Sequence, residues 1–189
     1  MIHMVQNKNN LYLEIILALL MNKAHLREIA RTLDESHSTI LRKINELLKE
    51  NVLDYKTEGK NKVFFIKNNL KAKNYVYSAE IHKLNKLLKK HPELSIILED
   101  VKKNFQKGMI ILFGSYAKEI AKRESDVDIY LETNDNMVKT KIKEINSKLS
   151  IKIGKFDTKS LLIREIIKNH IIVRGLEDFY ERVEFFKEA

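Results

Sequence analysis

One short segment restricts the fold of this 189-residue chain more than any other. The apolar run from Met109 to Phe113 is typical of a buried strand, and Gly114-Ser115 and a helical stretch follow it at once. A strand that passes through a Gly-Ser turn into a helix leaves free backbone N–H groups, which bind phosphate oxygens. Gly114 permits a close approach and the Ser115 hydroxyl adds a donor, so this turn is a candidate phosphate site.

A second strand, predicted within residues 125–131, carries two acidic side chains. Asp126 and Asp128 are two positions apart, so on a strand both carboxylates lie on one face while Val127 and Ile129 enter the core. Neighbouring carboxylates repel each other unless a cation lies between them. Oxygen ligands of this kind suit Mg²⁺ that is bound together with substrate phosphates.

In this order, and with ten residues between Ser115 and Asp126, the two segments resemble the signature of the DNA polymerase β-type nucleotidyltransferase superfamily. The similarity is closest to its minimal prokaryotic branch, which often forms the antitoxin half of toxin–antitoxin pairs, and it covers residues 108–189. It implies transfer of a nucleoside monophosphate from an NTP, with ATP as the expected nucleotide, and release of pyrophosphate.

The resemblance also implies roles for single residues. Asp126 and Asp128 would be catalytic and would hold two Mg²⁺ (or Mn²⁺) ions, and Gly114 and Ser115 would bind the outer phosphates. Lys118 on the following helix would neutralise phosphate charge. The alternative for Lys118 is an ordinary solvated lysine.

Active members of this superfamily usually add a third carboxylate on the neighbouring strand. Here that strand is predicted at residues 150–154, where Lys152 takes the position that an acid would occupy. Asp157 lies just beyond and is the candidate third metal ligand and catalytic residue, with a turn or helix cap as its alternative role. If Lys152 replaces the carboxylate, one metal site is incomplete and catalysis is slow or lost.

The N-terminal third has a different pattern. Helical spacing predicts helices at residues 11–21 and 26–33, and a third, capped by Ser36 or Ser38, that ends near Glu50. Two β-like runs at residues 52–57 and 62–66 then form a predicted hairpin with a basic tip. This order resembles the winged-helix domains of small bacterial and archaeal transcriptional regulators.

That resemblance predicts DNA-binding residues on the outer face of the third helix and on the wing. They are Ser38, Thr39, Arg42 and Lys43 on the helix and Lys60 and Lys62 on the wing. The formal net charge is +9, and the excess lies in the first 107 residues, where it could neutralise phosphates. The alternative is a module for dimerisation or protein contact, with a lysine-rich surface that is merely solvated.

Composition excludes several other classes of protein. The chain has no cysteine, so disulfides, thiol nucleophiles and cysteine metal sites are absent. The longest unbroken apolar run, from Ile15 to Met21, is too short to span a bilayer, and the first residues do not resemble a secretory signal. There is no P-loop motif. We therefore expect a cytoplasmic protein without a membrane partner.

Together these patterns predict an α+β protein with three parts: a winged helix-turn-helix domain at 1–70, a helical linker at 71–107, and a nucleotidyltransferase domain with a small mixed sheet at 108–189. The first hypothesis is an enzyme that modifies a hydroxyl of a protein or nucleic acid and also binds DNA. The second is a DNA-binding regulator whose catalytically degenerate domain senses nucleotide or dimerises. In both, a homodimer is expected.

Overall fold

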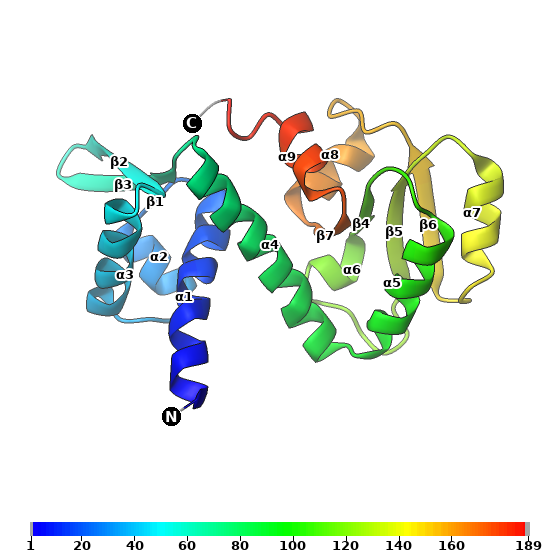
Figure 1. Ribbon diagram of the computed structural model, residues 1–189, viewed down its shortest axis with the longest axis horizontal. Coiled ribbons are helices and arrows are strands. Elements are labelled where there is room, and N and C mark those ends of the chain that lie inside the picture. Colours follow the sequence, from blue (N-terminus) through cyan, green and yellow to red (C-terminus); the bar gives the residue numbers. More distant parts are fainter. Residues whose placement is uncertain (1, 188–189) are drawn as a thin grey trace. The chain divides into compact units, whose positions relative to one another are not determined.

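The computed structural model describes the backbone of residues 2–187 and the side chains of residues 10–187. Within this range the chain divides into two compact units, one formed by the residues up to His82 with Phe186 and Lys187, the other by Lys83–Phe185. Each unit contains helices and a β-sheet, so the expected α+β class is confirmed (Figure 1). No helix within residues 2–187 is long and apolar enough to cross a membrane.

The first unit begins with three helices and a three-stranded antiparallel sheet. These elements are α1 (Ile2–Met21), β1 (Ala24–His25), α2 (Leu26–Thr32), α3 (His37–Lys49), β2 (Leu53–Glu58) and β3 (Asn61–Ile66). The predicted third helix begins after Ser36, whose Oγ accepts a hydrogen bond from the Thr39 N–H at 3.2 Å. Ser36 is therefore the N-cap, because its hydroxyl satisfies a backbone donor of the first turn.

The sheet of the first unit has the strand order β1-β3-β2. The predicted hairpin of β2 and β3 is confirmed, and Gly59 provides the left-handed backbone of its turn with φ of +60°. Strand β1 was not predicted, because its two residues are too few for an alternating pattern. The core of this unit is built from apolar side chains at helical spacing and from the hairpin: Ile15, Ile16, Leu19, Ile29, Ile40, Ile44, Leu47, Leu53 and Phe64.

The second unit is organised around a four-stranded mixed sheet with the order β6-β5-β4-β7. Its helices are α5 (Glu93–Asn104), α6 (Gly114–Ala117), α7 (Asn136–Lys143), α8 (Leu161–Lys168) and α9 (Leu176–Arg182), and its strands are β4 (Ile110–Leu112), β5 (Val127–Glu132), β6 (Leu149–Gly154) and β7 (Ile171–Arg174). Strands β5 and β6 are parallel, and β4 pairs antiparallel with both β5 and β7. Strand β6 therefore forms one edge of the sheet (Figure 1).

Alternation along β5 separates the two faces of this sheet. Val127 and Ile129 belong to one buried core cluster with Leu98 of α5 and Ile142 of α7. Tyr130 lies on the opposite face, where its ring meets that of Phe156 and its hydroxyl donates to the Gly154 carbonyl at 2.8 Å. Asp128 shares the Tyr130 face, because residues two apart on a strand point to the same side.

The unit boundaries differ from the predicted divisions at 1–70, 71–107 and 108–189. The predicted linker is not a separate region, since the first part of α4 (Leu70–Lys90) belongs to the first unit and α5 to the second. The apolar stripe of α5 explains its place. Leu94, Leu98, Val101 and Phe105 are all buried, and together they form part of the core beneath the second sheet.

Candidate functional site

The Gly-Ser turn lies where β4 ends beside the start of β5. The three residues of β4 are fully buried, and the next residue, Phe113, donates its backbone N–H to the Asp128 carbonyl at 2.9 Å. Gly114 then opens α6, which is a single turn. The predicted order of strand, turn and helix is therefore present, and hydrogen bonding between neighbouring strands brings the turn to Asp128.

Gly114 is the point of closest approach between the two sequence motifs. Its φ is +70°, a left-handed conformation that L side chains rarely adopt. A Cβ atom at this position would lie 2.2 Å from Oδ2 of Asp128 and 3.0 Å from its Cγ. Two independent features therefore require glycine at position 114. One is the left-handed backbone conformation, and the other is the Asp128 carboxylate, which lies against the Gly114 Cα.

The two predicted acidic residues are placed at the beginning of β5. Asp126 directly precedes the strand and is exposed, and Asp128, its second residue, is half-buried. Neither carboxylate forms an ion pair or side-chain hydrogen bond with any residue in the described part of the chain. Glu132, near the other end of β5, differs in this respect, because it forms an ion pair with Arg182. The central feature of the candidate site is therefore a pair of carboxylates that lie beside a Gly-Ser turn and have no side-chain partner in the described part of the chain.

Strand β6 supplies the neighbours of these acids. In the parallel register Asp128 pairs with Ser150 and Tyr130 with Lys152, so Ser150 and Lys152 lie on the Asp128 face. Lys152 thus lies on this face of β6, but Ser150 and not Lys152 is the register partner of Asp128, and β6 contains no acidic residue. The role of Ser150 was not predicted, because only the register of β5 with β6 shows it.

Asp157 lies in a turn three residues beyond the end of β6. Its Oδ1 accepts a hydrogen bond from the Lys159 N–H at 2.9 Å, and its carbonyl accepts one from the Ser160 N–H. Among residues 10–187 no three or more His, Asp or Glu side chains are grouped so that they could hold a metal ion. The structure therefore does not bring Asp157 together with Asp126 and Asp128.

Lys118 and Tyr116, which follow the Gly-Ser turn, each contact a residue outside the motif. Lys118 forms an ion pair with Glu165 of α8 at 2.6 Å, and this hydrogen bond and charge lower the pKa of the Glu165 carboxyl. Tyr116 is buried, and the edge of its ring meets that of His91 at 5.0 Å between centroids. Burial raises the pKa of the Tyr116 hydroxyl, which stays neutral at pH 7. The sequence did not reveal either of these contacts.

The residues present fit one divalent cation. Mg²⁺ in phosphate-transfer sites is held by one or two carboxylates, and water and substrate phosphates complete its ligands. Asp126 and Asp128 provide these carboxylates, and the glycine at position 114 leaves the space beside Asp128 free of a side chain. A second ion would have to share the same two groups.

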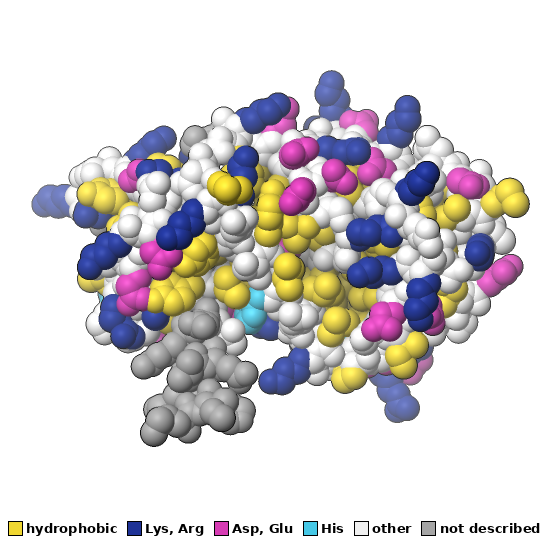
Figure 2. Space-filling model, in the orientation of Figure 1, with side chains coloured by type: hydrophobic (Ala, Val, Ile, Leu, Met, Phe, Trp, Pro, Cys, Tyr) yellow, Lys and Arg dark blue, Asp and Glu magenta, His cyan; other side chains and the backbone are white. Residues whose placement is uncertain are grey.

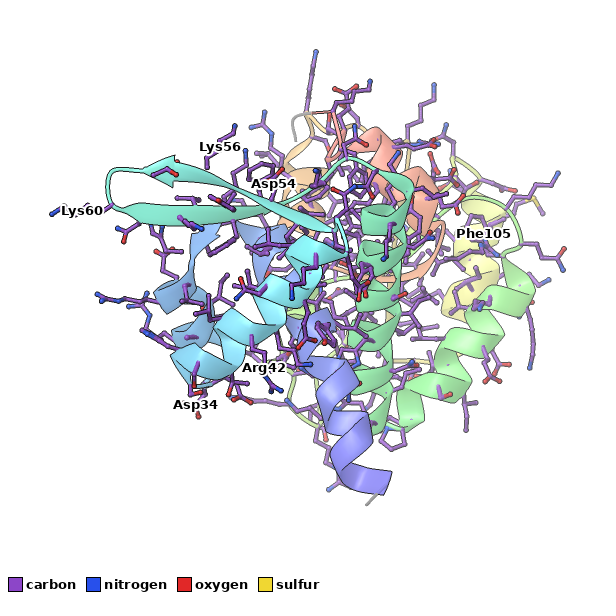
Figure 3. The ribbon with its side chains drawn as sticks, turned by 60° about the vertical axis from the view of Figure 1, so that its left-hand side comes forward. Asp34, Arg42, Asp54, Lys56, Lys60 and Phe105 are labelled. Atoms are coloured by element: carbon purple, nitrogen blue, oxygen red, sulfur yellow. The ribbon has the colours of Figure 1, made fainter. Side chains whose placement is uncertain are left out.

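The predicted DNA-binding residues of α3 are not all on its surface. Ser38 and Arg42 are exposed, Thr39 is half-buried, and Arg42 projects from α3 in Figure 3. The prediction that Lys43 lies on the outer face is wrong, since only 5% of Lys43 is exposed. Its Nζ donates to the Tyr12 hydroxyl at 2.7 Å and pairs with Glu46 at 3.3 Å. The apolar stem of lysine allows this placement, because it packs in the core while the ammonium finds polar partners.

The hairpin brings basic side chains close to aromatic rings on both of its faces. Lys60 extends from its tip (Figure 3), and the Lys62 Nζ lies 4.0 Å from the centre of the Tyr55 ring. On the other face, the Nζ of Lys56 lies 5.5 Å from the centre of the Phe65 ring. On the face shown in Figure 2, Asp and Glu side chains lie among the Lys and Arg side chains, so the basic residues there do not form one continuous patch.

Comparison with known proteins shows what the second unit is similar to. A family model described as a nucleotidyltransferase domain matches residues 94–183. The C-terminal part of the chain is similar to a nucleotidyltransferase domain. The match extends from α5 to the residue after α9 and includes the Gly-Ser turn and both aspartates.

Two further comparisons add less. The search of curated proteins finds no match. Among solved structures, a chain from a crystal structure of a toxin-antitoxin with AMP-PNP is 20% identical to this one. The alignment covers 49% of this chain and 80% of that chain, with a TM-score of 0.37.

Proposed function

We propose that the protein is a Mg²⁺-dependent nucleotidyltransferase that transfers a nucleoside monophosphate from an NTP, ATP in the first instance, to a hydroxyl of a protein or nucleic acid. One observation carries the proposal. Within the matched domain, the Gly114 turn lies directly against the uncommitted Asp128 carboxylate. A phosphate held by the turn would therefore be beside the groups that can hold a cation.

The residues have distinct parts in the proposed reaction. Gly114 and Ser115 hold the outer phosphates through backbone N–H groups and the serine hydroxyl. Asp126 and Asp128 hold Mg²⁺ (or Mn²⁺), which when bound neutralises phosphate charge and polarises the phosphoryl oxygens. The acceptor oxygen forms a bond to the α-phosphorus, the bond from the α-phosphorus to the bridging oxygen breaks, pyrophosphate leaves, and the hydroxyl proton passes to water.

Lys118 is proposed as a further nucleotide ligand. Its partner Glu165 is exposed to solvent at 43% of its side chain, so the ion pair is screened and contributes little to stability. The multiple charges of a triphosphate compete well with such a pair. Nucleotide binding would then release Glu165, whose pKa would rise toward its ordinary value.

For the first unit we propose a winged helix that binds DNA. The order of α2, α3 and the hairpin supports this assignment, with α3 as the helix that enters the major groove. Exposed Ser38 and Arg42 would contact DNA from α3, with Thr39 beside them, and Lys60 and Lys62 would contact the backbone from the hairpin. A homodimer would bind two such half-sites.

The second candidate function is a DNA-binding regulator whose nucleotidyltransferase domain binds nucleotide without turnover. The absence of an acidic residue from β6 favours it, because Asp128 then has Ser150 rather than a carboxylate as its neighbour. The two functions differ in one measurable property. Both bind nucleotide, and only the first releases pyrophosphate.

Calorimetry with a non-hydrolysable ATP analogue and Mg²⁺ tests the shared part of both proposals. We expect binding by the parent protein and loss of binding in Asp126→Asn/Asp128→Asn, since the cation loses both carboxylates. Glu99→Gln, at an exposed position of α5, is a control for the loss of one negative charge away from the site and should bind like the parent. Equal affinity of the parent and the double variant would refute the assignment of the site.

DNA binding is tested separately with fragments of the neighbouring chromosomal region. Affinity should fall steeply with salt, because Lys and Arg displace counterions from the phosphates. Arg42→Ala should reduce the preference between sequences, whereas Lys60→Ala should weaken binding to all of them. Lys102→Ala on α5 is the control for the lost positive charge. If no fragment binds at low salt, the first unit is not a DNA-binding module.

A further inference from the structure

An exposed lysine lies on the same face of the sheet as the two free carboxylates. Lys152 is the fourth residue of β6 and pairs in register with Tyr130, two residues along β5 from Asp128. Register partners on neighbouring strands point to the same face of a sheet, and so do residues two apart on one strand. Lys152 and Asp128 therefore share a face. A lysine side chain is long enough to reach across one strand and two residues toward the cation site.

Lys152 is also uncommitted. Lys148, just before β6, donates its Nζ to the Arg123 carbonyl at 2.8 Å, and Lys118 is paired with Glu165. Lys152 forms no ion pair or hydrogen bond through its side chain with any residue that the structure describes. It is therefore free to bind a ligand that approaches this face.

One divalent cation does not balance the negative charge of both the two aspartates and a bound triphosphate, so a lysine near the site could neutralise phosphate charge. A single divalent cation balances Asp126 and Asp128, which leaves the charge of a bound triphosphate to be met by the protein. A second cation would need ligands of its own, and no group of three acidic or His side chains exists among residues 10–187 to provide them. On the Asp128 face the next polar positions of β6 are Ser150 and Lys152.

We propose that Lys152 binds a phosphate of the nucleotide, and that the site consequently takes an NTP with one divalent cation rather than two. The inference rests on the proposed nucleotide-binding function and extends it to a residue outside the two sequence motifs. Lys152 replaces part of the charge of a second cation with an ammonium group, whose three N–H donors bind phosphate oxygens.

There is a structural alternative for Lys152. Lysines on edge strands discourage pairing with the strands of other molecules, and β6 is an edge strand. This role would leave nucleotide affinity untouched by substitution. It would instead make the variant self-associate, so nucleotide affinity and association state separate the two explanations.

Calorimetry with a non-hydrolysable ATP analogue and Mg²⁺ tests the proposal directly, because it requires neither an acceptor nor turnover. Lys152→Ala should weaken binding by about tenfold or more, the loss expected for one charge-assisted hydrogen bond. Lys152→Arg should remain near the parent value. Lys143→Ala, at an exposed position of α7, is the charge-matched control and should not change the affinity.

The number of bound cations is a second readout. Electron paramagnetic resonance of Mn²⁺ with the saturating analogue should show one ion per chain in the parent. In Lys152→Asp, which adds an acid beside the site, a second ion should bind. Two ions in the parent, or unchanged analogue affinity in a folded Lys152→Ala, would overturn the inference. Absence of analogue binding by the parent itself would instead refute the proposed function on which it rests.

Discussion

Replacing Gly114 by alanine tests whether the Gly-Ser turn and Asp128 form one site. The added Cβ atom would lie 2.2 Å from the Asp128 Oδ2, so the carboxylate must move. Gly59 provides a matched control, because its φ is +60° and nothing lies within 4 Å of the corresponding Cβ position. The two substitutions impose nearly the same backbone strain and differ in the contact with Asp128.

The expected magnitudes follow from this difference. A left-handed conformation costs a residue other than glycine roughly 1–2 kcal/mol, so Gly59→Ala should lower the free energy of unfolding of its unit by about that amount. At Gly114 the displaced Asp128 side chain adds about 0.5–1.5 kcal/mol for leaving its rotamer. Gly114→Ala should therefore cost about 1.5–3.5 kcal/mol. It should also weaken binding of the Mg²⁺–ATP analogue, whereas Gly59→Ala should not.

Hydrogen exchange followed by mass spectrometry measures each unit separately, and calorimetry measures nucleotide affinity. We expect a larger loss of protection in the second unit of Gly114→Ala than in the first unit of Gly59→Ala. If the two losses are equal, and Gly114→Ala binds the analogue like the parent, the turn and Asp128 do not act together and the site is wrongly assigned.

Three further predictions concern single side chains. Lys71 and Tyr75 donate hydrogen bonds to the Glu50 carboxylate and lower its pKa. The stability that these contacts contribute is therefore present above the unfolded pKa near 4.5 and is lost as the pH falls through the folded pKa. Acid unfolding of Glu50→Gln should lack this pH-dependent loss. Lys43→Ala should lower the unfolding free energy by about 1–3 kcal/mol, because it leaves the part-buried Tyr12 hydroxyl and the Glu46 carboxylate without their partner. Chemical denaturation should show no such loss for Arg42→Ala at the exposed neighbouring position. Asp157→Ala should cost about 1 kcal/mol through its turn and leave nucleotide affinity at the parent value in calorimetry, whereas a loss equal to that of Asp128→Asn would show a metal ligand.

Local patterns predicted much of the fold. The helical spacing of Ile40 and Ile44 predicted α3, and the apolar run before Gly114 predicted β4. The alternation around Asp128 predicted β5 and the shared face of its polar residues. These features depend on neighbours within one element, where side-chain periodicity is decisive.

Features that depend on tertiary contacts were not predictable in the same way. Lys43 has the helical spacing of the buried stripe of α3, and its charge alone suggested the outer face. The packing of α1 against α3 brings the Tyr12 hydroxyl to its ammonium. The ion pair of Lys118 with Glu165 joins residues far apart in the sequence. The place of Ser150 beside Asp128 depends on the strand register, which a one-residue shift would reverse.

Transfer of label from an α-phosphate-labelled NTP to an acceptor shows whether the protein catalyses nucleotidyl transfer. The protein is incubated with Mg²⁺ or Mn²⁺ and a cell extract, in parallel with Asp128→Asn and with Glu99→Gln as the control. We predict that an acceptor in the extract becomes labelled by the parent and by Glu99→Gln, and that Asp128→Asn abolishes the label. Label that never exceeds the Asp128→Asn background with any of the four NTPs would contradict nucleotidyl transfer and favour the nucleotide-binding regulator.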